Sequence, residues 1–192
     1  MSKKLFEDYE DLIWHEDISD CDEFLSGLIE TEIYFCPAMF LERIKIPNIL
    51  GTFTSAGIIS ENLKCKKRRG FYKLRGFIEQ NDLTAQVSDN SSKSTLTIYL
   101  LGLKANRIGL ARKLKMIPGV YIVKDFNQRF WIVGTDISPA FATCELNTGK
   151  KFDDDSGMQI KLSSNSIFYQ YTGAIPLPPE SDFSDDFSFE FY

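Results

Sequence analysis

The sequence has little of what most catalytic and metal sites require. It contains one histidine, His15, and four cysteines, none of which forms a Cys-x-x-Cys pair, so the usual zinc-ligand spacings cannot be assembled. It also lacks Gly-x-Ser-x-Gly, His-Glu-x-x-His, P-loop and Gly-x-Gly-x-x-Gly motifs, which mark several large classes of enzyme. We therefore expect no catalytic residue, no metal, no cofactor and no enzymatic activity.

Long apolar runs are also missing. No run of about 18 apolar residues occurs, and a transmembrane helix needs such a run. The opening MSKKLFED contains no apolar segment typical of a secretory signal peptide. We therefore expect no membrane contact, and reduced thiols at Cys21, Cys36, Cys65 and Cys144, although the sequence leaves disulfides open.

The acidic and basic residues are separated along the chain. Residues 1–60 carry 4 basic and 12 acidic side chains, 61–130 carry 15 and 5, and 131–192 carry 3 and 10. The three blocks therefore have net charges of −8, +10 and −7, within a whole chain of −5. Such blocks indicate either nucleic acid against the middle block or charge-matched contacts between copies.

The composition predicts one domain with two arms. A length of 192 residues with 43% hydrophobic and 14% aromatic residues is enough for one real core. We assign residues 1–23 to an acidic N-terminal arm and 24–171 to a single β-rich domain. Residues 172–192, with three prolines followed by acidic residues and phenylalanines, are expected to be an extended C-terminal tail.

The pattern of β-branched and aromatic residues predicts strands around one helix. Strands or strand-like runs are expected at Ile29–Phe35, Met39–Ile46, 95–103, Val120–Lys124, Arg129–Gly134, Ala140–Leu146, Met158–Leu162 and Ile167–Tyr171, with a polar loop at 81–94. The expected helix is 104–119, ended by Pro118-Gly119, with a buried face of Ile108, Ala111, Leu114 and either Met116 or Ile117. This order predicts a β-rich α+β fold, a β-sandwich or small barrel with one flanking helix.

The segment GVYIVKDFNQRFWIVGTD, residues 119–136, predicts a β-hairpin. Alternation places Val120 and Ile122 on one side of its pleat and Tyr121 and Val123 on the other. We expect one side to pack under the helix and the other to meet a neighbouring copy or a lumen.

Two segments invite a catalytic or metal-binding interpretation. His15 lies beside Glu16 and Asp17, but an acidic arm offers no buried pocket, so we interpret it as a surface or interface histidine. The segment FDDDSG, residues 152–157, has the carboxylates of a cation loop but lacks the spacing and distal glutamate of an EF-hand. We interpret it as a solvated turn, with a metal at Asp153–Asp155 left open.

The segment KCKKRRGFYKLRG, residues 64–76, combines basic and aromatic side chains. It suits a strand that contacts an acidic neighbouring copy or faces a lumen, a nucleic-acid-binding segment, or a solvated loop. The first is favoured, because the whole protein is acidic and no known nucleic-acid-binding module accompanies the segment. The candidate contact residues are Lys64, Lys66, Lys67, Arg68, Arg69, Lys73 and Arg75.

The acidic tail has the composition of a segment that docks aromatic side chains into pockets on a partner, with a disordered tail as the alternative. Its candidate anchors are Phe183, Phe187, Phe189 and Phe191.

The hairpin and the residues after it contain an ordered set of motifs. These are Gly119, Val123-Lys124-Asp125, Asn127, Trp131 and Gly134, then Thr148-Gly149, Asp153-Asp154-Asp155, Gly157 and Gln159-Ile160-Lys161-Leu162. This order resembles small virion structural proteins of phages that infect gut Bacteroides, including crAss-like phages. The resemblance covers residues 20–36 and 95–171, a little under half of the chain.

The resemblance implies a tail-tube-like fold and a subunit of a homo-oligomeric tail or head–tail connector ring around a DNA channel. Its implied partners are other copies, neighbouring tail, connector or portal proteins, and DNA contacted without sequence specificity. The implied location is the virion, after assembly in the host cytoplasm. The candidate contact between rings is the hairpin turn Asp125, Phe126, Asn127 and Gln128.

The sequence departs from that pattern in three places. Gln128 replaces a usual glycine, and the basic segment and the acidic tail are extra. These departures favour a specialised ring over a repeating tube subunit. The alternative function is a nucleic-acid-binding module that uses the basic segment 64–75.

Overall fold

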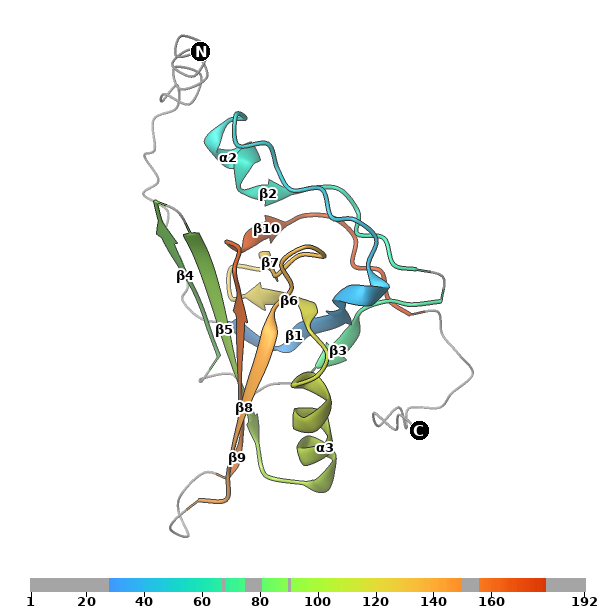
Figure 1. The fold of residues 1–192 in the computed structure, drawn as a ribbon, viewed down its shortest axis with the longest axis vertical. Helices are drawn as coiled ribbons and strands as arrows, with labels where there is room; N and C mark the ends of the chain where they lie inside the picture. Colours follow the sequence, from blue (N-terminus) through green and yellow to red (C-terminus); the bar gives the residue numbers. More distant parts are fainter. Residues whose placement is uncertain (1–27, 67, 75–80, 90, 150–155, 179–192) are drawn as a thin grey trace.

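Two β-sheets that share a core form the body of the protein (Figure 1). The computed structural model describes residues 28–66, 68–74, 81–89, 91–149 and 156–178. Over these residues strands far outnumber helices, so the expected β-rich α+β class is confirmed. No helix of the described part is both long enough and apolar enough to span a membrane.

The larger sheet has six strands, gathered from distant parts of the chain. In spatial order they are β2 (Ile58–Ile59), β10 (Tyr169–Tyr171), β7 (Phe130–Val133), β6 (Gly119–Asp125), β1 (Leu28–Pro37) and β3 (Tyr72–Leu74). β2 and β10 are parallel, and the other neighbouring pairs are antiparallel. The expected hairpin is confirmed as β6 and β7, which place Ile122 opposite Ile132.

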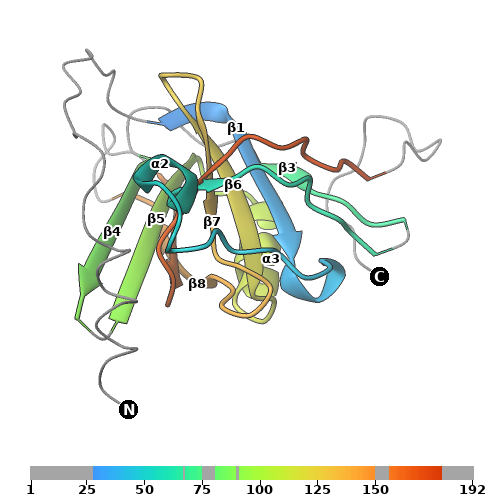
Figure 2. The ribbon, with the colours of Figure 1, turned by 90° about the horizontal axis from the view of Figure 1, so that it is seen from above.

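The smaller sheet is antiparallel and has four strands. In spatial order they are β4 (Asp82–Ser88), β5 (Ser91–Leu101), β9 (Gly157–Ser164) and β8 (Phe141–Asn147). β5 and β9 bury nearly every second residue, as expected for a sheet with one face on a core. Figure 1 shows this sheet upright beside the larger one, and the view from above shows β4, β5 and β8 to one side of β6 and β1 (Figure 2).

The helix α3 (Ala105–Leu114) matches the expected helix and connects β5 to β6. It packs against β8 (Figure 1). Ala111 and Leu114 are buried as predicted, and of the two alternatives Ile117, not Met116, packs against the hydrophobic core. Ile108, in the first half of α3, is 42% exposed, so the buried face is narrower than the spacing predicts.

The first hydrophobic core lies between the two sheets. The four-stranded sheet contributes inward residues such as Leu96, Ile98 and Ile160, and the six-stranded sheet contributes Tyr121 and Val123. Each large apolar side chain buried in this way stabilises the fold by about 1.5–3 kcal/mol relative to an exposed one. These contacts hold the two sheets together.

The second core lies on the opposite face of the six-stranded sheet. Ile122 and Ile132 of the sheet pack there with Leu63 and other residues of the connection 38–71. We call this connection, together with residues 172–178, the covering layer. Its short helices are η1 (Ala38–Phe40), a 3-10 helix, and α2 (Phe53–Ala56).

Hydrogen bonds from β10 and the residues after it tie the covering layer to the sheet. The Tyr171 hydroxyl accepts a bond from the Leu63 amide at 3.1 Å and donates one to the Ala174 carbonyl at 2.6 Å. The Phe71 amide donates to the Pro176 carbonyl at 2.8 Å. These bonds therefore connect the two parts of the covering layer, residues 38–71 and 172–178, to each other and to β10.

Two expectations for local structure are wrong. The run Met39–Ile46 is not a strand: apart from a single bridge between Leu41 and Cys65, its residues form η1 and irregular chain over the sheet. Its apolar side chains cover a sheet instead of extending one. The expected polar loop at 81–94 contains β4 and the start of β5, because strands exposed to water on much of both faces carry polar side chains.

The expectation that one side of the hairpin is open is also wrong. Val120 and Ile122 on one side, and Tyr121 and Val123 on the other, are all 0% exposed. The first pair lies under the covering layer and the second pair faces the four-stranded sheet. A central strand that is buried on both faces usually consists of consecutive apolar residues, and β6 contains such a run from Val120 to Val123.

Candidate assembly surfaces

The outward face of the four-stranded sheet is polar. One row across all four strands consists of Asp82, Thr97, Lys161 and Thr143. The neighbouring row consists of Thr84, Thr95, Ser163 and Phe141. Of the two hydrophobic clusters of the described residues, the first lies on the inward face of this sheet, and the second lies on the far face of the six-stranded sheet. The face is therefore a broad surface suited to water or to a polar partner.

Both edges of this sheet are unpaired within the described residues. β4 forms one edge and β8 the other, and each contains seven residues with a strand on only one side. The edges of the six-stranded sheet are shorter, with two residues in β2 and three in β3. An unpaired edge presents free N–H and C=O groups that can pair with another chain.

The two long edges carry few of the side chains that block such pairing. Each has one charged residue, Asp82 on β4 and Glu145 on β8, and neither has a proline or a lysine. Val87 on β4 is 70% exposed and Phe141 on β8 is 60% exposed. Sequence reasoning missed the β4 edge because it assigned those residues to a loop.

The basic segment lies on the covering layer and β3. Lys64, Lys66, Arg68, Arg69 and Lys73 are all exposed. Lys64 precedes the bridge at residue 65, Lys66, Arg68 and Arg69 follow it, and Lys73 lies in β3. The structure therefore places the described part of the segment at the surface, next to and on the edge strand β3 of the six-stranded sheet.

Two of these cations lie over aromatic rings of the same domain. The Arg69 guanidinium is 4.5 Å from the centroid of the Phe40 ring, and the Lys73 ammonium is 5.5 Å from that of Tyr34. Exposed contacts of this kind contribute about 0.5–1 kcal/mol each. They position the basic segment against η1 and β1.

The hairpin turn is built around Asp125. Its carboxylate, which is 8% exposed, accepts hydrogen bonds from the Arg129 amide at 2.8 Å and from the Trp131 indole nitrogen at 2.9 Å. Gln128, where the resembled pattern has glycine, adopts a left-handed φ of 65° and is exposed. Asp125 therefore shapes the turn, while Gln128 presents its side chain to solvent.

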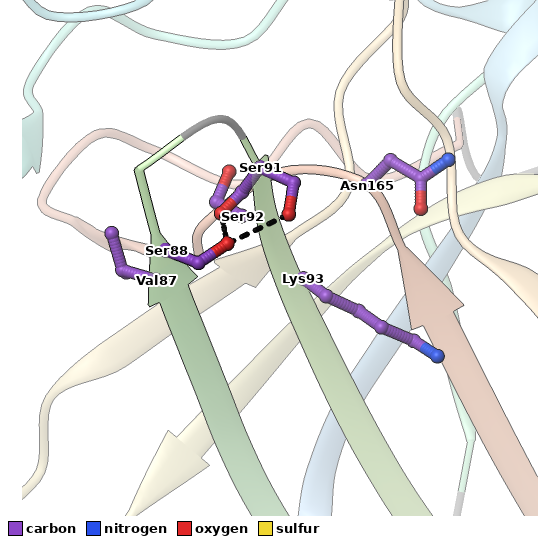
Figure 3. Close-up of a pocket in the computed structure, with 6 residues that line it drawn as sticks. All are labelled: Val87, Ser88, Ser91, Ser92, Lys93 and Asn165. Carbon is purple, nitrogen blue, oxygen red and sulfur yellow. Dashed lines mark hydrogen bonds between the residues drawn. The ribbon is translucent and has the colours of Figure 1, made fainter.

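A wide hollow of about 750 Å³ lies where β4 turns into β5 (Figure 3). Its lining contains Val87, Ser88, Ser91, Ser92, Lys93 and Asn165. The Ser88 hydroxyl donates to the Ser91 carbonyl at 3.0 Å, and Lys93 extends away from the serines (Figure 3). None of these lining residues is an acid or a histidine that would activate a serine.

Several candidate residues lie outside the described part of the chain. They are His15, Lys67, Arg75, Asp153–Asp155, Phe183, Phe187, Phe189 and Phe191. Among the residues that are described, no group of three metal-ligating side chains is gathered in one place.

No protein-family model, curated protein or solved structure matches the chain. The function is therefore inferred from the surfaces described above and from the sequence.

Proposed function

We propose that the chain is a virion structural protein, the subunit of a closed homo-oligomeric ring in a phage tail or head–tail connector. The observation that carries this proposal is the pair of long, unpaired edges on opposite sides of one sheet. In the ring, β8 of one copy pairs with β4 of the next. This contact is heterologous, and a heterologous contact repeated by rotation closes into a ring.

Strand direction agrees with this pairing. The order β4-β5-β9-β8 is antiparallel throughout, so β4 and β8 run in opposite directions. A rotation about a ring axis keeps the direction of each strand along that axis. β8 and the next copy's β4 are then antiparallel, and the sheet continues around the ring without a change in its pattern.

The four-stranded sheet has one polar and one apolar face, and this difference supports a ring with a central channel. A sheet continued around a ring has one face toward the axis and one away from it. The apolar face already packs on the six-stranded sheet, so the polar face, with Lys93 and Lys161, lines the interior. Threonines and lysines suit a water-filled channel that DNA crosses without sequence-specific contacts.

The motif order described for residues 119–162 supports the phage assignment, the tail-tube-like β-sandwich and the virion location. Neighbouring tail, connector or portal proteins are the further partners in this proposal. The Asp125–Gln128 turn, with Gln128 exposed, is its contact with the next ring.

The proposal is tested on the full chain by mass photometry over a range of concentrations and by negative-stain electron microscopy. We expect closed rings. Val87→Lys and Phe141→Lys should each raise the concentration needed for assembly by about tenfold or more, since each removes apolar contact from an edge. Both side chains are exposed in the single subunit, so its melting temperature should change little.

Ile49→Lys and Met39→Lys are the matched controls. These residues are 73% and 64% exposed and belong to the covering layer, which packs on the face of the six-stranded sheet opposite the smaller sheet, so ring formation should be unchanged. A chain that stays monomeric at every concentration and is missing from purified phage particles would contradict the proposal. Rings unaffected by either edge variant would show that another surface closes them.

A nucleic-acid-binding module is the second candidate, because the described cations of the basic segment are exposed. It predicts binding to short DNA that weakens steeply with salt. Replacing Lys66, Lys67, Arg68 and Arg69 together by glutamine should abolish that binding. No binding at low salt would remove this candidate.

A further inference from the structure

Two cysteines that are distant in sequence lie where the six-stranded sheet packs against the covering layer. Cys36, at the end of β1, is 0% exposed, and the chain then reverses direction through η1. Cys65 bridges Leu41, immediately after that reversal. Cys36 is part of the second hydrophobic core and Cys65 packs against it, and each thiol shifts the pKa of the other.

The backbone holds Cys65 firmly in this position. On one side of it the Glu42 amide donates to the Lys64 carbonyl at 2.8 Å, and on the other the Lys66 amide donates to the Phe40 carbonyl at 2.8 Å. Cys65 is therefore fixed beside Cys36 and partly open to solvent. Its neighbours in the chain, Lys64 and Lys66, are exposed cations.

The two thiols have unequal acidity. The interaction with Cys36 lowers the pKa of Cys65 below its ordinary value, although burial and the Glu42 carboxylate oppose this shift. The same interaction, together with burial, raises the pKa of Cys36. Of the two, Cys65 is therefore the more acidic thiol, and thiolates are the nucleophilic form of cysteine. Cys144, whose pKa is raised by burial, lacks this activation.

We propose that Cys65 and Cys36 form an oxidisable dithiol, in which Cys65 is the residue attacked by hydroperoxides and Cys36 is the resolving thiol. This assignment is independent of the proposed ring. It rests on the juxtaposition of one accessible and one buried thiol, which is typical of redox-sensitive cysteine pairs.

The chemistry balances as follows. The Cys65 thiolate attacks the terminal oxygen of the hydroperoxide, the O–O bond breaks, and the alkoxide or hydroxide leaves with a proton from solvent. Cys65 is then a sulfenic acid. The Cys36 sulfur attacks the Cys65 sulfur, the S–O bond breaks, and hydroxide leaves with the Cys36 proton as water. Two thiols are oxidised to one disulfide, and the peroxide is reduced.

A disulfide at this place would link the end of β1 to the start of the basic segment. It closes a loop that contains η1, α2 and β2, which is most of the covering layer. Closing such a loop restricts the unfolded chain, and we expect the melting temperature to rise by about 5–10 °C.

The test treats the reduced full chain with hydrogen peroxide, blocks the remaining thiols by alkylation and maps the peptides under non-reducing conditions. The expected product is a peptide pair joined through Cys36 and Cys65 within one chain, formed together with the rise in melting temperature. Linkage through Cys21 or Cys144, linkage between chains, or no disulfide in the folded wild-type chain would overturn the proposal.

Variants separate the two roles. Cys36→Ser should leave Cys65 as a sulfenic acid that dimedone traps, whereas Cys65→Ser should remove both products. The matched control, Cys144→Ser, should form the disulfide as the wild type does. Circular dichroism checks each fold, and because Cys36 is buried, the wild-type peptide map decides the matter if Cys36→Ser does not fold.

Discussion

The two sheets of this protein differ in how much of them the chain itself covers. The six-stranded sheet has the smaller sheet on one face and the covering layer on the other, and its edge strands have only two and three residues. The four-stranded sheet has one polar face and two edges of seven residues each. The first is therefore largely buried within the subunit, whereas the second leaves one face and two edges open in the described residues.

This contrast separates stability from assembly. Substitutions in the six-stranded sheet should act on the folding of a single chain, since its side chains are buried in the monomer. Substitutions on the outward face or edges of the four-stranded sheet should act on contacts between chains.

The largest effect is expected at the centre of the six-stranded sheet. Ile122→Ala removes a fully buried side chain between the sheet and the covering layer, and should lower the free energy of unfolding by about 2–5 kcal/mol. Thr97→Ala, on the outward face of the smaller sheet, should change it by less than about 0.5 kcal/mol. Urea denaturation measures the free energy of unfolding of both variants. Similar decreases in the two would contradict the separation of stability from assembly.

The next effect concerns the link to the covering layer. Tyr171→Phe removes the hydroxyl that bonds Leu63 and Ala174, and should cost about 1–3 kcal/mol because two backbone groups lose their partner. Hydrogen exchange at the Leu63 amide should quicken at the same time. Unchanged protection at that amide would show that the layer is held by packing alone.

Tyr121 should behave in the opposite way. Its buried hydroxyl has no hydrogen-bond partner among the described residues, so Tyr121→Phe should stabilise the chain by about 1 kcal/mol. Burial raises the pKa of this hydroxyl, so the folded state keeps a proton that the unfolded state loses. The wild type should therefore lose stability as the pH rises above about 10, the ordinary tyrosine value.

Denaturation curves at neutral and alkaline pH measure this effect. The alkaline loss should be smaller in Tyr121→Phe than in the wild type. An identical pH dependence in both proteins would mean that the hydroxyl finds a partner in solution.

The smallest effect is expected in the hairpin turn. Gln128 adopts a left-handed φ of 65°, which glycine accepts at little steric cost, so Gln128→Gly should raise stability by about 0.5–1 kcal/mol. Thermal denaturation of this variant and of the wild type measures the change, and an unchanged or lower melting temperature would contradict it.

Local patterns predicted much of the fold. The β6–β7 hairpin was predictable because its strands are β-branched and aromatic and its turn is polar, and α3 was predictable from its spacing and from Pro118-Gly119. The apolar run Met39–Ile46 was wrongly predicted to be a strand, because a segment that covers a sheet and a segment that joins a sheet both carry apolar side chains. Only tertiary contacts distinguish the two.

The candidate site was less predictable. The described cations of the basic segment are exposed, and their role as contacts stays a prediction. The β4 edge was missed because an exposed strand has the composition of a loop. The meeting of Cys36 with Cys65 depends on the reversal through η1 and a long-range bridge. No local pattern in the sequence indicates either feature.

The covering layer also has a consequence for the order of folding. Its first half precedes the six-stranded sheet's hairpin in the chain, yet the bond from Leu63 to Tyr171 spans 108 residues. Contacts of such long range form late and slow a folding reaction. During synthesis, the bond from Leu63 to Tyr171 therefore cannot form until β10 emerges. Until then the covering layer lacks this tie to the sheet, and incompletely covered apolar surface makes a nascent chain prone to aggregation.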